Sequence, residues 1–406
     1  MNVTFRHMVL MLAATLWISC GGSGDEPGGS PMPQPKDTPI AFSGNLAEKK
    51  SESHDGTRAT TNALSDTHER FYAWAYKNTQ SSTTEIVMQD YTVNWLSGSA
   101  GTTTSNSSGW EYVNQQESDP VQSIKYWDFD AVDYRFFGYA GPKTSGTYPD
   151  YSCTTGSSDV TISFKVDVSK VVTGNPLKDP VSLALKDGST PLPLFSKLWY
   201  KGNSSLTAQR NSPVTLEFLQ PYVKVRFMFR QSESETTKFL LSDMSFRPTP
   251  PTGSGVQKTI ATAGTFTVTY PKSGSTEERW SVSNVTATLN PVVSGTYKGF
   301  TQDYYVAAAD ATADVKAGEK MWYVVIPAKD QGTYTLSVKV NGKEKSVDVP
   351  AQYMEWQPSY EYTYIFKITE AGGVEIDAVQ SAFTPWVSHE YRDNDENPDM
   401  YEVHNW

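Results

Sequence analysis

Apolar and polar residues alternate one for one over several stretches of this 406-residue chain, a pattern typical of β-strands that bury one face. Helical periodicity does not continue for more than three turns anywhere, and the best helical candidate, residues 307–316, consists mainly of small residues. Aromatic residues, which fit strands better than helices, make up 13% of the chain. The sequence therefore predicts an all-β fold of antiparallel β-sandwiches. The alternation is clearest from Val160 to Val166, from Val223 to Phe229, from Tyr334 to Val340 and from Tyr360 to Ile368.

A tight hairpin is predicted at Asn341-Gly342. Both residues tolerate the positive φ angles that a two-residue turn between antiparallel strands requires. Val347 and Val349 resume the inward pattern after the turn, so two paired strands are expected here.

The N-terminus has the parts of a bacterial export signal. A basic start is followed by an apolar run from Met8 to Ile18, which is too short to span a bilayer. The stretch LWISC, ending at Cys20, resembles a lipobox, although Trp17 stands where Leu is usual. We expect a lipoprotein signal peptide over residues 1–19, a diacylated Cys20, and a flexible Gly/Pro/Ser-rich tether over residues 20–39. The alternative is an ordinary signal peptide that happens to contain Cys20.

Charge and histidine content exclude several classes of function. The chain has 34 Lys and Arg against 45 Asp and Glu, a net charge of −11, so phosphate backbones would repel it and nucleic acid is not an expected partner. The span from Glu69 to Ser388 holds no histidine, which removes Ser–His–Asp, Cys–His and histidine-based zinc sites there. No spacing of acidic residues singles out a glycosidase pair. We therefore expect no catalytic site, no metal and no cofactor.

The C-terminal tail, residues 387–406, is acidic. Asp393, Asp395 and Asn397 stand at alternate positions, as calcium ligands can. However, Pro398 stands where an EF-hand loop needs Gly, and no Glu falls at the twelfth place. A solvated acidic loop is the favoured interpretation.

Several motifs follow one another in a characteristic order. They are the lipobox-like Cys20, GTRAT around Arg58, FYAWAY from Phe71, WEY from Trp110, YRFFGYAGP from Tyr134, VTLEFLQPYVKVRFMF from Val214, MWYVVIPA from Met321 and TPW ending at Trp386. This order resembles that of the Bacteroidetes fimbrillins, the type V pilins and their Mfa-like relatives. Two positions depart from the family pattern: Gln220 stands where His is frequent, and Ser359 stands where Gly is expected.

The resemblance implies two tandem antiparallel β-sandwich domains of transthyretin-like topology, and the length of the chain also favours two domains. Composition alone would divide the chain at the Pro-rich stretch 247–255, but the resemblance places the boundary near residues 202–212. We expect an N-terminal domain over residues 40–207 and a C-terminal domain over residues 208–406.

The resemblance also implies a function, that of a structural or adhesive pilus subunit. Such a precursor reaches the surface of the outer membrane as a lipoprotein, where an arginine-specific protease cuts a loop so that the first strand departs. A strand from another subunit then fills the vacated place and builds a fimbrium. Here the departing strand would use Ile40, Phe42 and Leu46, the cut would follow Arg58, and residues 40–58 would be lost. Alternatively, Arg58 is an exposed loop residue that is never cut.

The donor strand would come from the C-terminus, where Tyr401 and Val403 share one face. Alternatively, this tail closes the sheet of its own domain. The expected partners are other pilus subunits and a host or bacterial surface ligand. The second hypothesis is a glycan-binding surface lipoprotein that does not polymerise, because exposed Trp side chains can stack on sugar rings. Its candidates are Trp95, Trp110, Trp127 and Trp199, although their strand-like surroundings favour burial.

Overall fold

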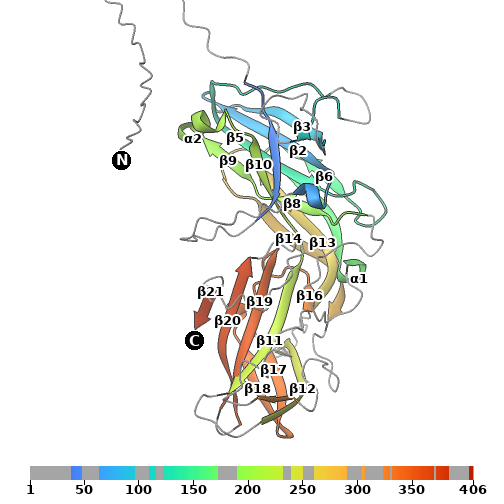
Figure 1. The fold of residues 1–406 in the computed structure, drawn as a ribbon, viewed down its shortest axis with the longest axis vertical. Coiled ribbons are helices and arrows are strands. Elements are labelled where there is room, and N and C mark those ends of the chain that lie inside the picture. The colour runs from blue at the N-terminus through green and yellow to red at the C-terminus, as the bar shows by residue number, and fades with distance from the viewer. Residues whose placement is uncertain are drawn as a thin grey trace, which may run out of the picture. The chain divides into compact units, whose positions relative to one another are not determined.

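The computed structural model describes residues 38–47, 64–96, 109–115, 122–171, 190–231, 239–249, 260–289, 304–306, 323–329, 332–369, 372–383 and 402–405. These residues form an all-β fold, as the alternation predicted (Figure 1). The described helices are short, because the longest of them, α2, has seven residues. The helical candidate at residues 307–316 lies outside the described residues.

The first part of the chain, to residue 219, contains ten strands and three short helices among the described residues. They are β1 (Phe42–Leu46), η1 (Leu64–Asp66), β2 (Arg70–Thr79), β3 (Thr84–Trp95), β4 (Trp110–Glu111), β5 (Ala131–Ala140), β6 (Ser152–Thr155), β7 (Asp159–Asp167), α1 (Val168–Val171), β8 (Leu194–Ser196), β9 (Trp199–Gly202), α2 (Asn203–Gln209) and β10 (Val214–Leu219).

The later part adds eleven described strands and one short 3-10 helix. They are β11 (Val223–Gln231), β12 (Phe239–Pro248), β13 (Ile260–Pro271), β14 (Arg279–Leu289), β15 (Tyr304–Val306), β16 (Tyr323–Val325), β17 (Tyr334–Val340), β18 (Lys343–Val349), η3 (Ala351–Tyr353), β19 (Tyr360–Ile368), β20 (Val374–Phe383) and β21 (Glu402–Asn405).

The largest sheet closes on itself. Its described strands pair in the order β2-β3-β4-β1-β10-β8-β5, and β5 pairs again with β2, so the seven strands form a ring. β9 pairs with β5 beside β8. In Figure 1, β1 is the deep blue strand beside β10.

A second sheet, in the order β14-β13-β7-β6, packs against this ring. Its inward aromatic side chains meet those of the ring: the ring centroids of Phe137 and Tyr270 lie 4.1 Å apart, and those of Phe195 and Phe266 lie 4.9 Å apart. β7 alternates buried residues with half-buried or exposed ones, as its sequence predicted. The two sheets therefore share one hydrophobic core, which we call the first core.

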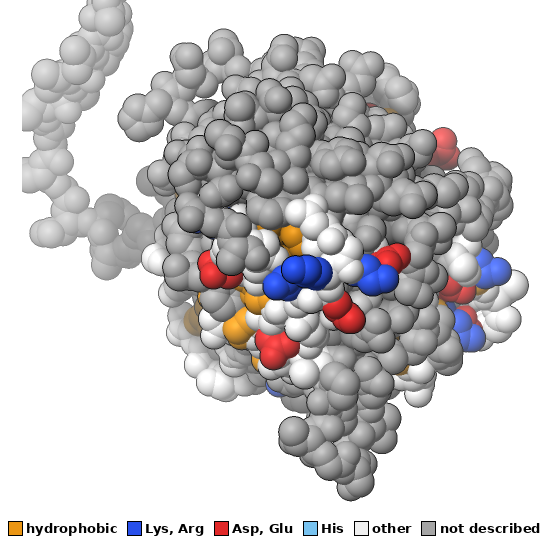
Figure 2. Space-filling view, turned by 90° about the horizontal axis from the view of Figure 1, so that it is seen from below, with side chains coloured by type: hydrophobic (Ala, Val, Ile, Leu, Met, Phe, Trp, Pro, Cys, Tyr) orange, Lys and Arg blue, Asp and Glu red, His pale blue; other side chains and the backbone are white. Residues whose placement is uncertain are grey.

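Two further sheets enclose a second core. Their described orders are β16-β11-β19-β20-β21 and β15-β12-β17-β18. The predicted hairpin is present, since β17 and β18 pair antiparallel around Asn341 and Gly342, whose φ angles are 49° and 76°. Seen from below in Figure 2, the described basic and acidic side chains are mixed rather than gathered by sign. Lys339 in β17 and Asp243 in β12 form an ion pair, with Lys339 Nζ 2.5 Å from Asp243 Oδ2.

β11 and β19 differ from the expectation of one buried face. Lys224 and Arg226, on the second face of β11, are 4% and 6% exposed. They are accommodated by polar residues of the parallel neighbour β19: Lys224 is paired in register with Glu361, and Arg226 Nε donates to Thr363 Oγ1 at 2.7 Å. Alternation thus located both strands, but burial covers both of their faces.

The hydrophobic cores do not divide at residue 207. β10 and Tyr222 belong to the first core, while Val223 opens the second. The β13 residues Phe266 and Tyr270, from the later half of the chain, also return to the first core. The boundary near residues 202–212 rests on the resemblance alone and stays a prediction. Most strand pairs are antiparallel, as expected, but β1 with β10 and β11 with β19 are parallel.

Candidate functional site: the place of strand β1

The candidate site is the place that residues 38–47 occupy, which we call the β1 site. β1 lies between β10 and β4. It pairs with β10 in parallel over five residue pairs, from Phe42 opposite Val214 to Leu46 opposite Phe218. Its pairing with β4 consists of one antiparallel pair, Phe42 with Trp110. Among the described strands, β1 is the one that joins β4 to β10, so the ring is closed only while β1 is in place.

Backbone hydrogen bonds continue beyond both ends of β1. Ala47 N–H donates to Phe218 O at 2.8 Å, and Val214 N–H donates to Ala41 O at 2.7 Å. On the other side, Ile40 N–H donates to Lys125 O at 2.8 Å, and Trp127 N–H donates to Thr38 O at 2.9 Å. Because backbone groups make these bonds, a different strand of similar shape can make them too.

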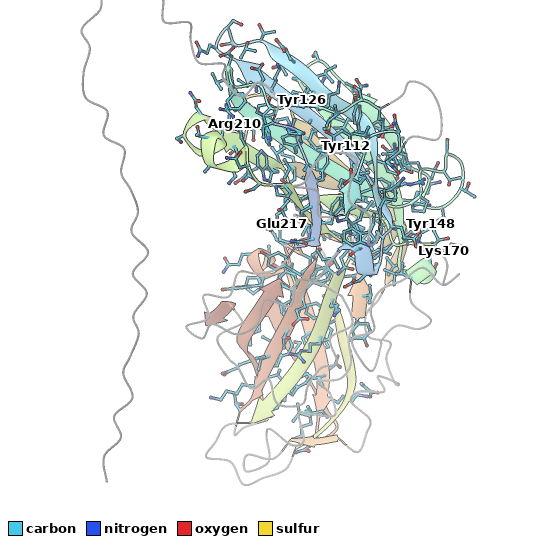
Figure 3. The ribbon with its side chains drawn as sticks, turned by 45° about the horizontal axis from the view of Figure 1, so that its top comes forward. Tyr112, Tyr126, Tyr148, Lys170, Arg210 and Glu217 are labelled. Carbon is cyan, nitrogen blue, oxygen red and sulfur yellow. The ribbon has the colours of Figure 1, made fainter. Side chains whose placement is uncertain are left out.

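The hydroxyl of Tyr112 fastens the start of this segment. Tyr112 follows β4, and its hydroxyl donates to Ile40 O at 2.9 Å while accepting from Lys125 N–H at 3.0 Å. Burial raises the pKa of Tyr112, so the hydroxyl keeps its proton at any physiological pH. Figure 3 labels Tyr112 and Glu217, which come from the segments on the two sides of β1.

Phe42 is the central side chain of the site. It is fully buried, and its ring makes edge-on contacts with Phe71, Tyr112 and Phe136 at centroid distances of 5.7, 5.8 and 5.9 Å. Such aromatic pairs contribute about 0.5–1.5 kcal/mol each beyond the area that they bury. Phe42 therefore connects β1 to β2, to β5 and to the segment after β4.

The structure brings the predicted departing-strand residues together. Ile40 and Phe42 are fully buried, and Leu46 is half-buried and packs against the first core. Sequence reasoning missed two residues of the site, Tyr112 and Leu64. The WEY motif marked Tyr112 only as an aromatic residue, and nothing in the sequence linked Leu64 to β1.

Other predicted residues fall elsewhere. Cys20, Arg58 and Tyr401 lie outside the described residues. Val403 lies in β21, opposite Gln380 of β20. β21 thus pairs with the sheet of its own chain, which is the alternative arrangement that the sequence left open for the tail.

The four tryptophans of the glycan hypothesis divide into two pairs. Trp110 and Trp127 are each 2% exposed, whereas Trp95 and Trp199 are half-buried. Trp95 packs against Trp110 at a centroid distance of 5.4 Å, and Trp199 packs against Trp127 at 6.3 Å. Each half-buried Trp therefore packs against a buried Trp, and only part of its side-chain surface is exposed.

The described residues contain no group of three or more His, Cys, Asp and Glu side chains arranged to hold a metal ion. Cys153, in β6, is an exposed free thiol. Among the helices that the structure describes, none has the length and apolar character needed to cross a membrane.

Comparison with known proteins gives structural matches only. No protein-family model and no curated protein sequence matches the chain. Among solved structures, a protein assigned to cell adhesion from Bacteroides uniformis matches with 16% identity and a TM-score of 0.31, covering 87% of this chain and all (100%) of that one.

Two further matches are named for fimbriae. A fimbrial assembly protein from Parabacteroides distasonis is 11% identical, with a TM-score of 0.29 over 84% of this chain and 91% of that one. The fimbrial anchor protein Mfa2 from Porphyromonas gingivalis is 8% identical, with a TM-score of 0.27 over 85% of this chain and 98% of that one. All three proteins come from Bacteroidetes, and a likeness at these TM-scores assigns no role to any residue of this chain.

Proposed function

We propose that this protein is a structural or adhesive subunit of a type V pilus, exported as an outer-membrane lipoprotein and assembled by exchange of strand β1. The observation that carries the proposal is the place of β1 in the ring. A segment near the N-terminus completes a sheet whose other described members come from residues 70–219. A cut in the chain between β1 and η1 would leave this strand attached by non-covalent contacts alone.

Those contacts are strong enough to hold β1 after a cut. Burial of a side chain such as Ile40 or Phe42 contributes about 1.5–3 kcal/mol. The backbone bonds along both edges of residues 38–47 add to this. Cleavage therefore prepares the exchange, and an incoming strand that restores the same bonds completes it.

The donor in our proposal is the C-terminal strand that carries Tyr401 and Val403. In its own chain, β21 pairs with β20 over four residue pairs, from Ala378 opposite Asn405 to Ser381 opposite Glu402. Leaving this position breaks a short ladder at the end of a five-stranded sheet. The loss is small compared with a full strand pairing inside another subunit.

The remaining elements of the proposal rest on the sequence. Lipidation at Cys20, cleavage after Arg58 by an arginine-specific protease, the outer-membrane location and the later place in a fimbrium all follow from the resemblance and the N-terminal motif. We propose that the protein is not an enzyme. The span from Glu69 to Ser388, which contains most of both cores, has no histidine, and no pair of acidic residues is marked out by its spacing.

The decisive experiment follows the protein into fimbriae on the bacterium that produces it. Sheared fimbriae are purified, and the N-terminus of this subunit is sequenced. Cleavage after Arg58 predicts a subunit that begins at Ala59, and Arg58→Ala should keep the protein out of fimbriae while Lys50→Ala, in the same stretch of chain, does not. Fimbriae that contain an uncut chain would contradict the proposal.

The donor role has its own test. A chain that lacks Asp399–Trp406 should fold and be cut, and it should enter fimbriae only at an end. Equal incorporation of truncated and complete chains along the fimbria would overturn the assignment of Tyr401 and Val403.

Glycan binding remains the second candidate, because Trp95 and Trp199 are half-buried rather than buried. Binding of the purified protein to an array of glycans, lost on Trp199→Ala or Trp95→Ala, would favour it. In that case the uncut chain would be the active form.

A further inference from the structure

Gly44 marks a point of β1 where a side chain has little room. It lies on the buried face of the strand, two residues after Phe42. A Cβ atom at this position would stand 3.0 Å from Leu64 Cδ2 and 3.4 Å from both Leu64 Cβ and Trp110 Cε2. Its backbone is not in the left-handed region that favours glycine, so the requirement is for space and not for a special φ angle.

The residues that limit this space are held in place. Leu64 is fully buried in η1, and its carbonyl accepts from His68 N–H at 2.8 Å and from Thr67 N–H at 3.1 Å. Trp110 is 2% exposed and packs between Phe71 and Trp95 at centroid distances of 4.9 and 5.4 Å. A side chain larger than a methyl group at position 44 would have to displace one of these two residues.

We propose that the β1 site selects its strand at this point. It accepts a strand with a large aromatic residue in the place of Phe42 and glycine in the place of Gly44. The strand that it takes comes from another kind of subunit and not from the C-terminus of a second copy of this chain. This inference rests on the proposed strand exchange and adds the chemistry by which the partner is chosen.

The C-terminal strand of this chain does not meet the requirement. With Tyr401 in the place of Phe42, Val403 would face Leu64; with Val403 in that place, Asn405 would do so. Residues 399–406 contain neither glycine nor alanine. The same strand can still serve as a donor to a subunit whose corresponding position is wider, so the subunit would join unlike neighbours.

The test uses the full-length chain with a site-specific protease sequence in place of residues 51–57. After cleavage, fluorescent peptides compete with the bound β1 strand. The probes are residues 38–47, the same peptide with Gly44→Val, the same peptide with Ser43→Val, and residues 399–406. Ser43 precedes Gly44 and is half-buried on the other face of the strand, so Ser43→Val is the matched control.

We expect the unchanged peptide and the Ser43→Val peptide to exchange, and the Gly44→Val and C-terminal peptides to bind at least about tenfold more weakly. Binding of the Gly44→Val peptide or of residues 399–406 as tight as that of the unchanged peptide would overturn the inference. If no peptide exchanges, including the unchanged one, the proposed function fails.

A second measurement tests the selection at Gly44 even if no peptide exchanges. In the uncut full-length protein, Gly44→Val should lower the midpoint of urea unfolding and Ser43→Val should not. The Gly44→Val loss should shrink when Leu64→Ala is added, because the truncated side chain makes room. Equal midpoints for Gly44→Val and Ser43→Val would refute the inference.

Discussion

The hydroxyl of Ser359 binds the backbone of Gln220 twice. Gln220 N–H donates to Ser359 Oγ at 2.8 Å, and the same hydroxyl donates to Gln220 O at 3.1 Å. The backbone N–H of Ser359 donates to Tyr222 O at 2.9 Å, so residue 359 joins the start of β19 to the segment between β10 and β11. These two residues are the positions at which the sequence departs from the fimbrillin pattern. Since only the backbone of Gln220 takes part, the contact depends on the residue at 359.

Two substitutions of Ser359 separate the effect of its hydroxyl on stability from the effect of its backbone φ angle. Ser359 has φ 66°, which costs an L-residue energy, and Gln220 is buried. Ser359→Ala keeps the strained angle and removes the partner of Gln220 N–H, so we expect a loss of about 1–3 kcal/mol in the free energy of unfolding. Ser359→Gly relieves the angle and should lose less. Urea unfolding of the two variants measures the difference, and an alanine variant as stable as the unchanged protein would contradict this account.

Removal of the Phe42 ring should destabilise the first core. Phe42→Ala leaves a cavity among Phe71, Tyr112 and Phe136, and such substitutions cost about 3–5 kcal/mol. The matched control is Ser43→Ala, one residue along the same strand. Chemical unfolding should show a large loss for the first variant and little change for the second. Similar losses in both would mean that β1 contributes little to the stability of the ring.

His68 should make the protein sensitive to mild acid. It is 3% exposed, and burial lowers its pKa from 6.5 to about 4. A neutral ring suits its surroundings, with Nε2–H donating to Leu192 O at 2.7 Å and Nδ1 accepting from Thr67 Oγ1 at 2.9 Å. Between these pKa values the unfolded chain binds the proton more tightly than the folded one, so stability falls as the pH drops from 6.5 towards 4.

The full pKa difference corresponds to about 3 kcal/mol of stability, present above pH 6.5 and lost progressively below it. His68→Gln removes this titration. The urea midpoint is measured at steps between pH 7.5 and pH 4. It should fall less over this range in the variant than in the unchanged protein. Parallel curves for both proteins would show that His68 is not the group responsible.

The prediction of lipidation at Cys20 rests on the sequence alone. Cys20→Ser should give a protein without acyl chains that is released from the outer membrane. Labelled palmitate incorporated by the variant would refute the lipobox. The unchanged protein should incorporate the label and fractionate with the outer membrane.

Alternation located the strands better than it described their pairing. Period-two patterns predicted β7, the β17–β18 hairpin and β19 within a few residues. The same pattern fits parallel and antiparallel neighbours, so the parallel pairs β1–β10 and β11–β19 could not be predicted. Nor could the return of β13 to the first core, because that depends on contacts between distant segments.

Only part of the β1 site could be predicted, because some of its contacts join segments that are distant in the sequence. Ile40 and Phe42 share a face of an apolar segment, which was enough to expect their burial. The hydroxyl of Tyr112 and the side chain of Leu64 reach β1 only in the folded chain. The sequence analysis gave Gly44 no role, because the limit on its space comes from Leu64 and Trp110, which approach it only in the folded chain.

The parallel register of β1 and β10 has a mechanical consequence. The chain enters β1 from the N-terminal side, where the predicted tether would end, and leaves β10 towards the second core. In a parallel pair these two exits point to opposite ends of the ladder. If the proposed acyl anchor at Cys20 is present, a pull between it and the second core loads the hydrogen bonds of β1 and β10 in shear, all together, and not one after another as in unzipping. In the proposed anchored form, an uncut subunit would therefore resist flow through the β1–β10 pair of the ring.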